Sequence, residues 1–117
     1  MRVDRSPRIW LLDIRGEIAG IRDLTKDVAF ETFAGSWAMT RAVQHALLII
    51  AEAAKHVPPD LKALEPSVPW RQIYGLGNML RHEYRRIDPV VVWSVVTDHL
   101  ASLDAAAAAI HDRVPDE

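Results

Sequence analysis

The segment from residue 77 to residue 84 places several side chains capable of chemistry within one short stretch. It reads Gly-Asn-Met-Leu-Arg-His-Glu-Tyr, with an amide at Asn78, an imidazole at His82 and a phenol at Tyr84. Asn78 and His82 are four residues apart, so on a helix they share one face. An imidazole titrates near neutral pH and can take a proton from a hydroxyl or give one to a leaving group. The spacing therefore indicates a small polar site rather than a segment of the core.

Arginines beside this histidine would suit a phosphodiester substrate. Arg81 directly precedes His82, and Arg85 follows it by three residues. A guanidinium donates paired hydrogen bonds to phosphate oxygens and can stabilise charge in a transition state. These groups are the minimum for metal-independent RNA cleavage, in which the 2′-hydroxyl attacks its own phosphate. From the residues alone the alternative stays open, and it is the more common one: a histidine that caps a helix C-terminus among solvated arginines.

Neither a metal nor a cofactor is predicted. The sequence has no cysteine, and its other four histidines form no i, i+4 pair with a supporting carboxylate: His45, His56, His99 and His111. Glu52 lies within the apolar period of its predicted helix. It is either a surface residue beside the apolar stripe or a partly buried carboxylate paired with an arginine or histidine of the site helix.

Length and composition predict one compact domain over residues 1–117. Half of the residues are hydrophobic, the formal net charge is −2 and the sequence pI is about 6.2. These values argue against disorder and against a basic coat for nonspecific nucleic-acid binding. The absence of cysteine excludes disulfides and a cysteine nucleophile, so a cytoplasmic protein is expected. No membrane span is expected either, because Glu52 ends the most aliphatic block, residues 46–51.

Apolar residues recur at steps of three and four, which predicts four main helices in an antiparallel all-α bundle, plus short helical turns. The main helices are expected at residues 7–24, at 37–56, from 70 through the polar segment, and as one long helix at 89–111. Ser6-Pro7, Ser36 and Asp88-Pro89 are typical helix starts. Phe30 and Phe33 are expected to pack back on the core, and 60–65 should form a further turn. Gly75 and Gly77 each cost about 1 kcal/mol in a helix, which favours close approach by another helix or a subunit.

Several blocks in this order resemble the HepT-like group of HEPN-domain proteins, from about residue 8 to residue 103. They are Leu12-Asp13-Ile14, Ile50-Ala51-Glu52-Ala53, the approach from Pro66 to Trp70, the segment from Asn78 to Tyr84, Ile87-Asp88 and Val92-Trp93. The resemblance implies an all-helical bundle that forms a homodimer and cleaves RNA as the toxin of a type VII toxin–antitoxin pair. It also implies a minimal nucleotidyltransferase as the antitoxin, which silences the toxin by adding AMP to a tyrosine.

Carried over by position, the resemblance assigns the catalytic histidine to His82, the motif asparagine to Asn78 and the AMP-modified tyrosine to Tyr84. The family's arginine precedes the histidine by five positions, where this sequence has Gly77. If RNA cleavage survives, Arg81, Arg85 or an arginine of a partner subunit must supply the missing charge. The alternative is a noncatalytic helical protein that binds a nucleotidyltransferase or RNA. Substituting arginine for Gly77 is expected to separate the two.

Overall fold

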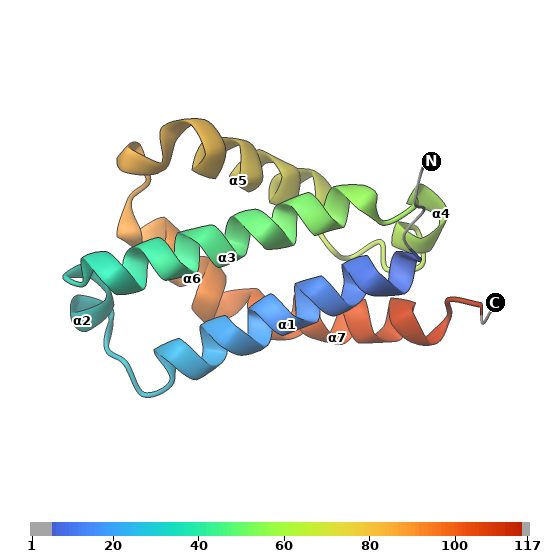
Figure 1. The fold of residues 1–117 in the computed structure, drawn as a ribbon, viewed down its shortest axis with the longest axis horizontal. Coiled ribbons are helices and arrows are strands. Elements are labelled where there is room, and N and C mark those ends of the chain that lie inside the picture. The colour runs from blue at the N-terminus through green and yellow to red at the C-terminus, as the bar shows by residue number, and fades with distance from the viewer. Residues whose placement is uncertain (1–5, 116–117) are drawn as a thin grey trace, which may run out of the picture.

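The chain folds into an all-α bundle, as the sequence predicts (Figure 1). The computed structural model describes residues 6–115, and within that range there is no strand. The elements are α1 (Pro7–Thr25), α2 (Phe30–Ala34), α3 (Trp37–His56), α4 (Pro59–Lys62), α5 (Trp70–Glu83), the 3-10 turn η1 (Tyr84–Arg86), α6 (Pro89–Asp98) and α7 (Leu100–Asp112).

Three helices begin at the residues that the sequence predicts. The Ser6 hydroxyl accepts a hydrogen bond from the Arg8 amide at 3.3 Å, and the Ser36 hydroxyl accepts one from the Met39 amide at 3.0 Å. The Asp88 carboxylate accepts one from the Val90 amide at 2.9 Å. Each bond satisfies a backbone donor that the first turn of a helix leaves unpaired.

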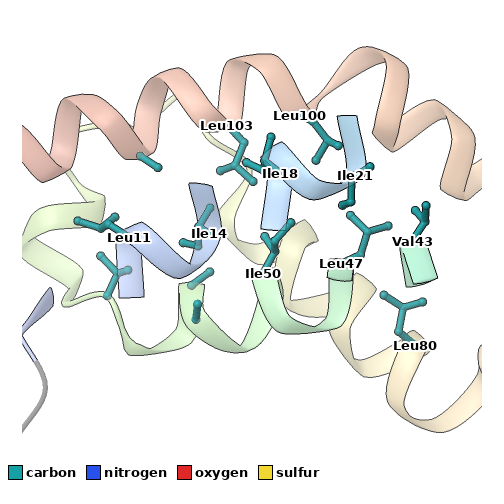
Figure 2. Packing of buried hydrophobic residues seen from close by; sticks show 14 of the residues in the cluster. Leu11, Ile14, Ile18, Ile21, Val43, Leu47, Ile50, Leu80, Leu100 and Leu103 are labelled. Carbon is teal, nitrogen blue, oxygen red and sulfur yellow. The ribbon is translucent and has the colours of Figure 1, made fainter. Parts of the chain in front are cut away.

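The core forms around α3, which lies between α1 on one side and α5 on the other (Figure 1). Apolar side chains from α1, α3, α5 and α7 converge in this layer (Figure 2). The most completely enclosed members of the α1 stripe are Leu11, Ile14 and Ile18. Since α5 packs mainly on α3, the position of the site helix depends chiefly on that single contact.

The connector after α1 packs back on the core through its aromatic residues, as predicted. Phe33 of α2 is fully buried, and the centroid of its ring lies 4.9 Å from the ring centroid of Trp93 on α6. Phe30 approaches the same indole edge-on, with 6.2 Å between ring centroids. These aromatic contacts hold α6 against α2.

The prediction of one long helix over residues 89–111 is wrong, because the chain breaks into α6 and α7 at His99. The two axes differ by 50°, and His99 has φ −124°. Near the break the Thr97 hydroxyl donates to the Trp93 carbonyl, a bond that bends helices. Trp93 packs on Phe33, so α6 is oriented by its contact with α2. The buried face of α7 packs instead along α1, which requires a different axis. Apolar periodicity cannot reveal this break, because both halves keep a buried face.

Over residues 6–115 no single helix has the length and hydropathy to cross a bilayer. In this described part of the chain, only α6 and α7 taken together reach that length and composition, as a bent pair.

Candidate active site

The C-terminal half of α5 and the start of η1 expose the predicted site residues Asn78, His82 and Tyr84 to solvent. Leu80 and Gly77 are buried against α3, and this fixes the rotation of α5 so that Asn78 and His82 point outward. Within residues 6–115 neither of these two side chains has a hydrogen-bond or ion-pair partner. An imidazole and an amide without protein partners are free to bind a ligand.

Gly77 occupies the closest contact between α5 and α3. A Cβ built on Gly77 would lie 2.6 Å from the Cβ of Ala51, a separation that real side chains do not adopt. The predicted close approach of another helix is therefore confirmed at Gly77. At Gly75, which is exposed, no atom of residues 6–115 lies within 4 Å of such a Cβ, so no helix of the same chain approaches it and approach by a subunit stays a prediction. An arginine at position 77 would collide with α3, so that substitution tests packing before it tests chemistry.

Arg81 is held by an ion pair with Glu52 of α3. Lys55 contributes a second cation, with its Nζ 3.5 Å from the Glu52 carboxylate. The side chains of Arg81 and Glu52 are 40% and 39% exposed. Of the two interpretations open for Glu52, pairing with an arginine of the site helix is the one found. The positive charge of Arg81 is consequently compensated before any substrate binds.

Tyr84 begins η1, two residues after His82, and its ring contacts two arginines. The guanidinium carbon of Arg41, from α3, is 4.9 Å from the ring centroid, and that of Arg85 is 5.7 Å away. Both distances fall within the range of cation–π contacts. Arg41 is not among the residues predicted from the sequence. In the sequence, Arg41 differs from other polar residues only in lying beside the apolar stripe of α3. Many solvated residues lie in such positions, so the sequence does not single it out.

A pocket of about 270 Å³ opens beside Tyr84. Its polar side is formed by Thr40, Arg41, Gln44, Tyr84 and Arg85, and its apolar side includes Phe33, Ile87 and Val92. We call it the Tyr84 pocket. It brings together α2, α3, η1 and α6, elements that are separate in the sequence. No cluster of three histidine, aspartate or glutamate side chains suited to a metal ion occurs between residues 6 and 115.

Over residues 6–115 the molecule is an all-α bundle in which the exposed His82 has no protein partner and lies two residues from a tyrosine that lines a basic, aromatic pocket. Comparison with known families gives a specific answer, because residues 14–110 match the ribonuclease HepT-like family. The chain belongs to this family. No solved structure matches the chain.

Two relatives show how far the similarity extends. A Thermococcus cleftensis protein named "Probable ribonuclease HepT" is 37% identical over 99 residues, which is 85% of this chain and 90% of the relative. A Methanocaldococcus jannaschii protein named "Putative RNase MJ1380" is 31% identical over 99 residues, covering 85% and 91% of the two chains. The similarity therefore includes the whole of α5 and η1.

Proposed function

We propose that this protein is a metal-independent endoribonuclease that acts as a toxin, with His82 as its acid–base residue. The observation that supports this most directly is the exposure of His82 and Asn78 at the end of α5, without protein partners. Arg85 lies one turn beyond His82 and has no carboxylate partner within residues 6–115, so its charge is available to a phosphate. Arg81 contributes less, because Glu52 already binds it.

The reaction is an internal transesterification of RNA. The 2′-oxygen forms a bond to the adjacent phosphorus as the bond from phosphorus to the 5′-oxygen breaks, giving a 2′,3′-cyclic phosphate and a 5′-hydroxyl. His82 takes the proton of the 2′-hydroxyl or donates one to the 5′-oxygen. In this proposal Asn78 donates an amide hydrogen bond to the phosphate, and Arg85 offsets the growing negative charge of the phosphate.

Replacing His82 tests this directly. His82→Ala should slow cleavage of single-stranded RNA in EDTA by roughly 10²–10⁴-fold, the usual contribution of a general acid or base. His111→Ala is the matched control, since His111 lies on α7, across the bundle from α5 (Figure 1). Its cleavage rate should equal that of the wild type. If His82→Ala also cleaved at the wild-type rate, His82 would not be the catalytic residue.

Tyr84 is the proposed site of silencing by a minimal nucleotidyltransferase antitoxin. Tyr84 is 38% exposed, and its hydroxyl has no hydrogen-bond partner in the part of the chain described. Transfer of AMP would form a bond between the Tyr84 oxygen and the α-phosphorus of ATP, with release of pyrophosphate. Mass spectrometry after incubation with such an enzyme and ATP should show one added AMP on the wild type and none on Tyr84→Phe. Equal modification of both proteins would place the target elsewhere.

A second candidate function is noncatalytic binding of RNA or of the nucleotidyltransferase. Gly77 favours it, since the position of the family's arginine is closed by Ala51. Under this alternative the wild type binds RNA without cleaving it, so the same EDTA assay separates the two functions. In either case we expect a homodimer.

A further inference from the structure

Arg41 lies on α3, the helix against which α5 packs, and its side chain contacts Tyr84 just beyond the end of α5. Its guanidinium contacts the rings of Tyr84, at 4.9 Å, and Trp37, at 5.8 Å. Its Nη1 donates to the Gln44 side-chain oxygen at 3.3 Å. Within residues 6–115 no carboxylate lies within ion-pair distance of Arg41 or Arg85. The Tyr84 pocket therefore carries two uncompensated guanidinium groups, in contrast to Arg81.

The dimensions of the Tyr84 pocket limit what it can hold. At about 270 Å³ it is slightly smaller than the roughly 300–1,000 Å³ pockets that enclose drug-sized ligands. It is too small for a duplex but comparable to one nucleotide unit. Its lining offers guanidinium forks suited to phosphate, and an aromatic ring and apolar floor suited to the faces of a base.

Gln44 adds a group that can recognise a base edge. Its side-chain oxygen is engaged by Arg41, which leaves the two amide hydrogens as donors. Unpaired bases of single-stranded RNA are read in this way, by stacking on aromatic or guanidinium planes and by hydrogen bonds to their edges.

We propose that the Tyr84 pocket binds one nucleotide of single-stranded RNA next to the scissile phosphate, with Arg41 and Arg85 on its phosphate and Gln44 on its base. The proposal rests on the ribonuclease function proposed above, because His82 lies only two residues from Tyr84. Arg41 would then supply, from α3, a phosphate contact that the α5 motif lacks at Gly77.

The experiment measures binding in a cleavage-deficient background. Fluorescence anisotropy with a short labelled single-stranded RNA should show that Arg41→Ala in His82→Ala weakens affinity about tenfold or more, the effect of losing a charged hydrogen bond. The slope of log affinity against log salt should also fall by about 0.7, the value for one lost contact to a single strand. Arg41→Lys, which keeps the charge and loses the fork, should bind with intermediate affinity.

Arg113→Ala in the same background is the control, because Arg113 is an exposed arginine at the end of α7 and its loss changes net charge equally. Its affinity should be unchanged. Equal weakening by Arg41→Ala and Arg113→Ala, or no weakening by either, would overturn the proposal. If Arg41→Ala unfolds, as circular dichroism would reveal, Arg41→Gln decides, because it removes the charge and keeps a polar side chain of similar length. Wild-type affinity and salt slope in Arg41→Gln would refute a phosphate contact.

Gln44→Ala tests base recognition with homopolymeric RNAs. It should reduce the differences in affinity among oligo-A, oligo-U and oligo-C, and unchanged differences would remove Gln44 from the proposal. Cleavage by the otherwise wild-type protein is measured in parallel. RNA binding that depends on Arg41 without any cleavage would contradict the ribonuclease function and leave the nucleotide site standing.

Discussion

Gly77 and Gly75 are two residues apart on α5, yet they meet opposite surroundings. Gly77 faces Ala51 across the tightest contact between α5 and α3, whereas Gly75 faces open solvent. The sequence predicts the same cost for both, since each lowers helix propensity by about 1 kcal/mol. Within one chain, only Gly77 makes a close packing contact that offsets this loss of helix propensity. The residue that breaks the family's arginine motif is thus also a structural residue of the bundle.

Alanine substitution at the two glycines should have opposite effects on stability. Gly77→Ala should lower the free energy of unfolding by about 1–3 kcal/mol, since the new methyl group overpacks the contact with Ala51. Gly75→Ala should raise the free energy of unfolding of the monomer by up to about 1 kcal/mol, because within one chain the new methyl group meets nothing and only helix propensity changes. Urea denaturation measures both. Adding Ala51→Gly to Gly77→Ala should recover part of the loss, and a failure to do so would mean that the clash is absorbed elsewhere.

At the scale of elements, apolar periodicity and capping residues predict the helices well. The second main helix, 37–56, coincides with α3, and the start expected at residue 70 coincides with α5. Pro59–Lys62 forms the expected additional turn near 60–65. The break at His99 could not be predicted, because it depends on where Trp93 docks rather than on which residues are apolar.

In the candidate site, too, the sequence predicts residues that are neighbours along the chain but not contacts between residues far apart in the sequence. Asn78, His82, Tyr84 and Arg85 are close in sequence, so one motif predicts that they are close in space. Arg41 meets Tyr84 and Arg85 only because α3 runs beside α5 and η1 packs near the first turns of α3. The pairing of Arg81 with Glu52 is another such contact, and it separates two arginines that the sequence leaves equivalent.

At the scale of the whole molecule, α5 is supported mainly by α3, and its outer face is uncovered (Figure 1). Met79 on this face is 45% exposed, and Gly75 leaves room beside it. Two copies of such a face could pack closely through a small residue and a flexible apolar one. This is the surface through which we expect the homodimer to form, and it would bring two copies of His82 near each other.

Multi-angle light scattering should therefore give twice the 13.2 kDa monomer mass. Met79→Glu should shift the protein toward the monomer, because two buried carboxylates would face each other across the two-fold axis. Leu12→Glu is the matched control: Leu12 is similarly exposed but lies on α1, on the far side of α3 from α5. A wild type that stays monomeric at every concentration would rule out the dimer.

The contact between Gly77 and Ala51 also has a consequence for how this sequence can diverge. The two positions belong to different helices but share one small volume, so neither can gain a side chain unless the other loses one or the helices separate. Among proteins that keep this helix spacing, their combined size should stay nearly constant. A relative with arginine at the position of Gly77 would then need its α5 turned or moved outward, and its catalytic surface would be carried along with that displacement.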